Sequence, residues 1–398
     1  MGLNLEALLF AALGGLFMGS YPVPIKHPSV LKANVHPVVF QCYKSGCVFV
    51  TGFLFLIPRA LSTDGLASLY EFTPWGLMSA AGWIPSGLTT IYSVPILGVG
   101  MAVGLSAGSS TVLSFLVFWL VMGEKVKEHS CGDGCQYYLA PVYVTLCVAG
   151  MFGMALLPKA KLPWGQQLDD DEDEADAGGD VANAKLLPAA ASNNLLAHAD
   201  DSDEEESGGG APVGRHRNHI SGLVAATMTG VFSAIQYGAV TAGKTYAQNA
   251  AGCHSDTDSC PPALKEKFDN FGSWMVSFGI GAALAAGVAY GVLIVLNLRA
   301  GKTYQSGLFP DFHWRVMRGP GLTAGGLWVL GNFFSTAAVV AGGNAVVMAQ
   351  VVGFQMVTSG AWGIFYYREI RGANAVAWGV AALLTMLTMI LLGLEKDK

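Results

Sequence analysis

The sequence is poor in charge and lacks the usual signatures of soluble enzymes. Only 13% of its 398 residues are charged, which is about half the share found in a soluble domain. It contains no Walker A motif, no acidic metal-binding cluster and no strand followed by a Gly-x-Gly-x-x-Gly turn. We therefore expect no ATP hydrolysis, no cofactor and no nucleic-acid partner. Apolar residues fill the chain instead: 52% are hydrophobic, 51 are glycine, and the mean hydropathy is +0.45. This composition is typical of membrane helices.

The apolar residues are grouped into ten long stretches. A helix needs about 20 mostly apolar residues to cross a bilayer. We therefore predict an all-α, multi-pass integral membrane protein with ten transmembrane helices in contact with the lipid bilayer. The predicted spans are 3–25, 38–58, 75–96, 99–122, 137–157, 219–242, 271–298, 318–341, 343–367 and 373–393. The first stretch carries Glu6 where a signal peptide would be basic, so we expect it to be retained as a span.

An acidic segment divides the ten stretches into two groups of five. Residues 165–214 carry 14 Asp or Glu and one basic residue, so the remainder of the chain has a net charge of about +7 although the whole has −6. Such a segment buries too little apolar surface to fold by itself. We predict a first five-helix unit at 1–158, an acidic disordered linker at 159–217 and a second five-helix unit at 218–398.

The second unit repeats parts of the first. At an offset of 245 residues Trp83 matches Trp328 and Glu124 matches Glu369. Within each unit the Trp and the Glu are therefore 41 residues apart. Weaker matches, mostly between glycines, are Gly98 with Gly343 at this offset and Gly15 with Gly230 at an offset of 215. Because five is odd, a second copy must enter the membrane from the opposite side. Inverted repeats of this kind build many secondary transporters and place a cavity between the two halves.

Three short motifs resemble a known family. "MGSYPVPIK" at the end of the first stretch, "GGLWVLGNFF" and "WGIFYYREIRG" are similar to segments of the transmembrane protein 144 family within the drug/metabolite transporter superfamily. The resemblance covers both units and is stronger in the second. It departs from the family at "GWIPSGL" and at "IQYGAVTAGK". The resemblance implies transport of a carbohydrate or of a carbohydrate derivative by alternating access.

The candidate substrate-binding residues begin with one helix face. Trp328, Asn332 and Ser335 follow one another at helical spacing, so the indole could stack on a sugar ring while the polar groups bind its hydroxyls. Trp83, Ser86 and Thr90 form the corresponding, weaker set in the first unit. The alternative is packing between helices, because Asn and Ser form hydrogen bonds across membrane helices. Both interpretations remain open at this stage.

Further candidates are polar residues inside the predicted spans. Apart from Arg318 at the first position of its span, Lys44 is the only lysine or arginine within them, and intramembrane charges usually face a cavity or a partner. The alternative is that Lys44 extends along its aliphatic stem to the membrane surface. Gln41 lies one turn earlier on the same face, and Gln236 and Tyr237 lie in the sixth span. Each of these could contact solute or form an interhelical hydrogen bond.

The cysteines add a separate expectation. Cys131 with Cys135, and Cys253 with Cys260, lie in polar loops on one side of the predicted topology, where disulfides would form in an oxidising compartment. No four ligands converge for zinc.

We predict a secondary transporter for a small polar solute, with or without a coupling ion, and no enzymatic activity. The alternative is a membrane receptor or scaffold that does not transport.

Overall fold

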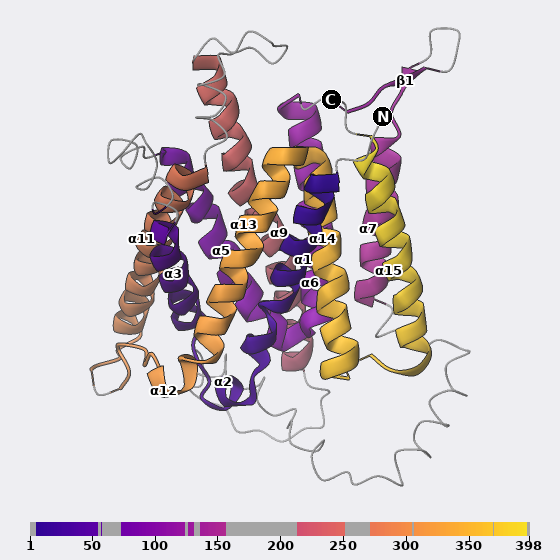
Figure 1. Ribbon diagram of the computed structural model, residues 1–398. Coiled ribbons are helices and arrows are strands. Elements are labelled where there is room, and N and C mark those ends of the chain that lie inside the picture. The colour runs from indigo at the N-terminus through magenta and orange to yellow at the C-terminus, as the bar shows by residue number, and fades with distance from the viewer. Residues whose placement is uncertain are drawn as a thin grey trace.

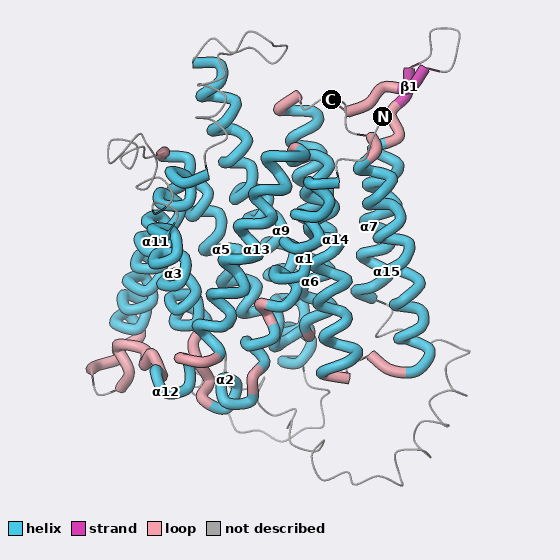
Figure 2. The backbone as a smooth tube through the Cα atoms, in the orientation of Figure 1, coloured by secondary structure: helices cyan, strands magenta, loops and turns pink. Residues whose placement is uncertain are grey.

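The protein is a bundle of long helices in the computed structural model (Figures 1 and 2). The structure describes residues 5–54, 57, 73–123, 126–130, 136–156, 213–250, 271–304, 306–368 and 370–395. Ten helices of 16 or more residues occur in these ranges, one at each predicted span. They are α1 (Leu5–Ser20), α3 (Pro37–Leu54), α5 (Pro74–Leu97), α6 (Val99–Leu116), α7 (Ala140–Leu156), α9 (Val213–Ala250), α11 (Phe271–Arg299), α13 (Pro320–Gly342), α14 (Asn344–Ala361) and α15 (Gly372–Gly393).

Seven of the described helices are long and apolar enough to cross a membrane. They are α1, α6, α9, α11, α13, α14 and α15, and α7 is apolar but shorter. Large aliphatic side chains such as Leu383, Val288 and Leu298 point outward and are more than half exposed, as expected for groups that face lipid. The protein is therefore a multi-pass integral membrane protein. α5 falls outside the seven and buries four polar residues, Ser79, Ser86, Thr90 and Ser93.

Short elements connect the long helices. The turn Val23–Lys26 and α2 (Pro28–Lys32) follow α1, while α12 (Trp314–Met317) precedes α13. Two π-helical segments extend α6 and α14, at Val117–Val121 and Trp362–Tyr366. Between α6 and α7 a small antiparallel hairpin pairs β1 (His129–Ser130) with β2 (Gln136–Tyr137).

α1 and α9, the first long helix before and the first after the predicted linker, run in opposite directions. In Figure 1, α1 begins and α15 ends at the upper end of the bundle, whereas α7 ends and α9 begins at the lower end. α1 therefore descends where α9 ascends. The lower end is called the linker end below, because the predicted linker joins α7 to α9 there. That linker lies outside the described residues except at its last residues, since α9 begins at Val213.

Helices of one half pack mainly against helices of the other half. The most extensive contacts join α5 with α9, α1 with α13 and α14, α3 with α11, α5 with α11, α7 with α15, and α6 with α9 and α14. Glycines allow the closest approaches. A Cβ atom on Gly15 would lie 2.7 Å from the backbone nitrogen of Gln355, and one on Gly230 would lie 2.7 Å from that of Ser110. A larger residue at either position would force the helices apart.

Candidate functional site

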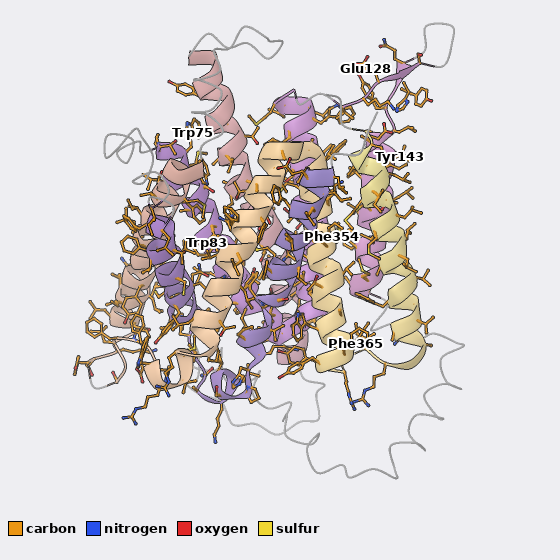
Figure 3. The ribbon with its side chains drawn as sticks, viewed as in Figure 1. Trp75, Trp83, Glu128, Tyr143, Phe354 and Phe365 are labelled. Carbon is orange, nitrogen blue, oxygen red and sulfur yellow. The ribbon has the colours of Figure 1, made fainter. Side chains whose placement is uncertain are left out.

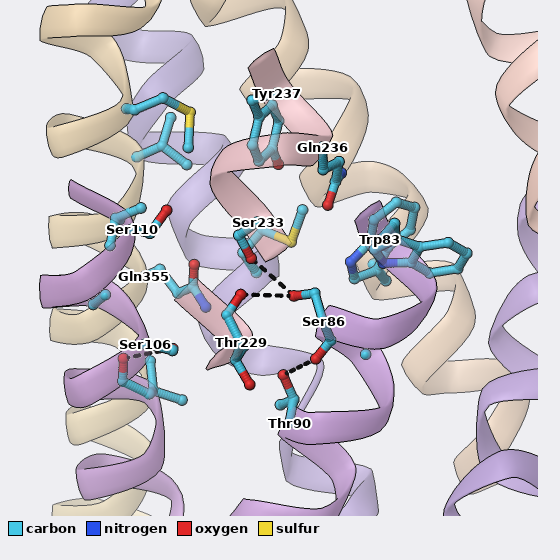
Figure 4. Close-up of a pocket in the computed structure, with 18 of the residues that line it drawn as sticks. Trp83, Ser86, Thr90, Ser106, Ser110, Thr229, Ser233, Gln236, Tyr237 and Gln355 are labelled. Atoms are coloured by element: carbon cyan, nitrogen blue, oxygen red, sulfur yellow. Dashed lines mark hydrogen bonds between the residues drawn. The ribbon is translucent and has the colours of Figure 1, made fainter. Parts of the chain in front are cut away.

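A cavity lies at the centre of the bundle, between the two halves (Figure 4). The space between its lining side chains, with its opening included, amounts to about 620 Å³. Its walls come from α1, α5 and α6 of the first half and from α9, α13 and α14 of the second. The lining residues are Met18, Tyr21, Trp83, Ser86, Gly87, Thr90, Val103, Ser106, Ala107, Ser110, Thr229, Ser233, Gln236, Tyr237, Trp328, Met348, Val351, Val352 and Gln355.

One wall of the cavity is rich in hydroxyl groups. The Ser86 hydroxyl on α5 donates to the Thr229 carbonyl on α9 at 3.1 Å and lies 2.9 Å from the Ser233 hydroxyl. Thr90 lies one turn below Ser86 and donates to its carbonyl at 2.8 Å. Figure 4 shows these groups gathered between the two helices. Hydroxyls can both donate and accept hydrogen bonds, so this wall suits a ligand that carries hydroxyls of its own.

A second wall of the cavity is aromatic and largely apolar. The ring centroids of Trp83 on α5 and Trp328 on α13 are 4.0 Å apart, and Phe278 on α11 lies beside both, at 5.5 and 5.7 Å. Both indoles are almost fully buried, and Figure 3 labels Trp83 among the helices of the bundle. The two indoles, one from each half, are therefore in direct contact with each other. Each indole extends into the gap between α5 and α13, and burying two large rings together is favourable.

Asn332 and Ser335 lie behind the cavity wall. The Gln236 amide on α9 donates to the Asn332 side-chain oxygen at 3.0 Å, and both side chains are buried. Gln236 itself lines the cavity, but Asn332 does not. Ser335 packs beside Gly14 of α1, whose missing side chain leaves room for it. Of the three residues predicted to share a binding face, only Trp328 reaches the cavity. Asn332 instead makes a hydrogen bond between two helices, as in the packing alternative.

Lys44 and Gln41 touch the cavity wall from the side of α3. Lys44 is fully buried, so the alternative of a side chain extended to the membrane surface is wrong. Its ammonium lies 4.5 Å from the centroid of the Tyr21 ring and 5.4 Å from that of Trp83. Gln41 lies against Gly87 of α5, where any side chain would meet its amide. Tyr21, Trp83 and Gly87 all line the cavity.

Several lining residues were not among the predicted site residues. Gln355 was recognisable as a polar residue inside a span, and five further polar or aromatic residues were missed: Tyr21, Ser106, Ser110, Thr229 and Ser233. A signal for the last four does exist in the sequence. Ser106 with Ser110, and Thr229 with Ser233, are each separated by one helical turn, which places each pair on one face. The predicted disulfide cysteines at 131, 135, 253 and 260 lie outside the described residues.

The cavity wall carries several kinds of polar and aromatic group. It offers hydroxyls, two amides and aromatic faces. Within the described residues, no group of three or more His, Cys, Asp or Glu side chains could hold a metal ion. The comparisons add no family: no protein-family model matches the chain, and no curated protein is significantly similar to it.

Proposed function

We propose that the protein is a secondary transporter that moves a small polar solute, a carbohydrate or a carbohydrate derivative, across a membrane by alternating access. In this proposal all ten long helices cross the membrane as two inverted five-helix repeats. The observation that carries the proposal is the central cavity, which three helices from each half enclose. Transporters built from inverted repeats bind their substrates at the interface between the repeats.

The pattern of helix packing supports the repeat. The repeat pairs each helix of the first half with one of the second: α1 with α9, α3 with α11, α5 with α13, α6 with α14 and α7 with α15. When the partners are exchanged, the contact of α1 with α13 becomes that of α9 with α5. The contact of α1 with α14 becomes that of α9 with α6, and α3 with α13 becomes α11 with α5. Each of these pairs is in close contact. The pairs α3 with α11, α6 with α14 and α7 with α15 map onto themselves. A two-fold relation between the halves produces this pattern.

Local geometry repeats at the offsets found in the sequence. Gly98 and Gly343 each precede a helix, and both have a positive φ, of 86° and 77° respectively. The π-helical segments begin at 117 and 362, again 245 residues apart. Gly15 of α1 approaches Gln355, and Gly230 of α9 approaches Ser110. Residues 110 and 355 are themselves 245 apart, so the two close approaches are equivalent.

The lining chemistry supports a carbohydrate. Hydroxyl-bearing solutes need hydrogen-bonding partners at close range, and the hydroxyl oxygens of Ser86, Thr90 and Ser233 can accept from them. The rings of carbohydrates also present an apolar face, which suits an aromatic side chain such as Trp328. The resemblance of three motifs to the transmembrane protein 144 family favours the same class of solute.

Contacts at the linker end account for how one side of the pathway closes. The Trp362 indole donates to the Ser20 hydroxyl at 2.9 Å, and the Tyr367 hydroxyl donates to the Val23 carbonyl at 2.8 Å. The Lys26 ammonium lies 5.2 Å from the centroid of the Tyr367 ring. These contacts join the end of α1 to the end of α14, one helix from each half. Opening toward the linker end requires them to separate.

Uptake by reconstituted liposomes tests the proposal. Full-length protein in liposomes should accumulate labelled sugar from a panel of neutral and acidic monosaccharides, and protein-free liposomes should not. A Cys pair at Ser20 and Trp362, cross-linked by oxidation, should stop uptake, and reduction should restore it. A receptor or scaffold would leave both kinds of liposome equal, which would reject the transporter.

A topology measurement tests the inverted repeat separately. Protease sites inserted at the C-terminus and in the linker should be cut from opposite sides of sealed vesicles, because five spans separate them. Cleavage of both sites from the same side would contradict two five-span units.

A further inference from the structure

One cation lies deep in the bundle without a counter-charge. Lys44 is fully buried in α3, and within the described residues its ammonium has no hydrogen-bond partner. The rings of Tyr21 and Trp83 lie beneath it at 4.5 and 5.4 Å. Such rings attract a cation through their electron-rich faces. That attraction is weaker than the hydration an ammonium loses at this depth, so an isolated charge here is costly.

The described part of the chain offers this ammonium no carboxylate. It contains four acidic residues, which all lie at helix ends or in connecting segments: Glu6, Glu128, Asp311 and Glu395. Beside Lys44 the Gln41 side chain is also incompletely paired. Its carbonyl oxygen is buried without a partner, and its amide nitrogen makes only a long contact of 3.5 Å with Ser45. A charged donor and an adaptable amide therefore lie together behind the cavity wall.

A short path joins these two groups to the cavity. Tyr21 and Trp83 contact the ammonium and also line the cavity. Tyr21 lies just after α1, where its backbone nitrogen still donates to the Phe17 carbonyl at 3.0 Å. Pro22 and Pro24 follow it and cannot continue the helical hydrogen bonds. The Tyr21 side chain forms a hydrogen bond with Thr90 of the cavity wall, and displacement of its ring would expose Lys44 to a ligand in the cavity.

We propose that the transported solute carries an anionic group, a carboxylate or a phosphate, and that this group pairs with the ammonium of Lys44. The hydroxyl-bearing part of the solute then occupies the space lined by Ser86, Thr90 and Ser233. The solute brings the counter-charge that the described residues do not supply. This inference rests on the transport function proposed above. Ammonium-to-anion hydrogen bonds are about twice as strong as neutral ones, so the anionic group would add greatly to affinity.

Binding to the purified full-length protein tests this inference. Affinity is measured from tryptophan fluorescence, or from the shift in thermal unfolding, with glucose, glucuronate and glucose 6-phosphate as probes. At least one anionic sugar should bind about tenfold more tightly than glucose, which corresponds to about 1.4 kcal/mol. Lys44→Gln should abolish that preference and leave glucose affinity within about twofold. The variant should fold, because it removes a buried charge. Lys32→Gln, at an exposed lysine of α2 outside the cavity, should keep the preference.

The outcomes separate this inference from the transport function. Preference for glucuronate alone assigns a carboxylate, and preference for glucose 6-phosphate alone assigns a phosphate; either supports the inference. Equal affinity for glucose and both anions, with glucose taken up by liposomes, overturns this inference only. An anion preference that survives in Lys44→Gln also overturns it. Absence of uptake for all three sugars by reconstituted liposomes, together with absence of binding, rejects the transport function and this inference with it.

Discussion

The hydrogen bond between Gln236 and Asn332 gives a prediction with a defined magnitude. These amides join α9 to α13 at 3.0 Å, and both are buried. Asn332→Leu places an apolar side chain in an apolar site but leaves the Gln236 nitrogen without that acceptor. A buried donor without a partner costs about 1–3 kcal/mol. We therefore expect Asn332→Leu to lower the free energy of unfolding by about 1–2 kcal/mol, because the better fit of leucine offsets part of the loss.

The double variant separates the bond from the rest of the site. In Gln236→Leu/Asn332→Leu neither amide remains, so the loss should be smaller than the sum of the two single losses. Hydrogen bonds between membrane helices show coupling energies of about 0.6 kcal/mol on average and up to about 1.7. The coupling here should lie in that range. It is measured by reversible unfolding of the full-length protein in mixed micelles, followed by far-ultraviolet circular dichroism.

A matched pair controls for the substitution itself. Gln350 on α14 donates to the Met389 carbonyl at 3.0 Å and shares no hydrogen bond with Asn332 in the described structure. Gln350→Leu/Asn332→Leu should therefore be additive within about 0.5 kcal/mol. Full additivity for the Gln236 and Asn332 pair as well would refute the interpretation that their bond holds α9 to α13.

Two further predictions concern the cavity and the membrane edge. Trp328→Ala should raise the KM of sugar uptake about 2–10-fold through loss of an aromatic contact. The control Leu330→Ala, two residues along α13 and 44% exposed, should leave the KM unchanged. Equal effects of the two substitutions would mean that Trp328 acts only in packing. Burial, with a smaller contribution from Lys302, lowers the pKa of His36 below 6.5, and its neutral ring accepts from the Val38 amide at 3.2 Å. The stability contributed by neutral His36 should therefore be fully present above about pH 6.5 and be lost as the pH falls below it. The loss should be less steep in His36→Asn. Identical thermal-unfolding profiles of the two proteins from about pH 5 to 8 would contradict this.

The sequence alone was sufficient to locate the long helices. Hydropathy is a local property, so ten apolar stretches could be recognised without any tertiary contact, and each corresponds to a helix. Spacing is also local, which is why Gly15 with Gly230 and Gly98 with Gly343 could be paired. These glycines occupy equivalent close approaches and equivalent turns. Trp83, Ser86, Trp328, Gln236 and Tyr237 lie around one cavity, and their role in binding a solute stays a prediction.

Only the tertiary structure decided which groups meet. Whether a polar side chain reaches a cavity depends on the rotation and tilt of its helix, and these depend on packing against helices that lie far away in the sequence. That is why Asn332 contacts Gln236 instead of open space, and why Trp83 contacts Trp328. It is also why Lys44, close enough to a helix end to reach the membrane surface, is directed inward instead. Its ammonium lies over two aromatic rings that come from α5 and from the end of α1, a contact that no local pattern in the sequence specifies.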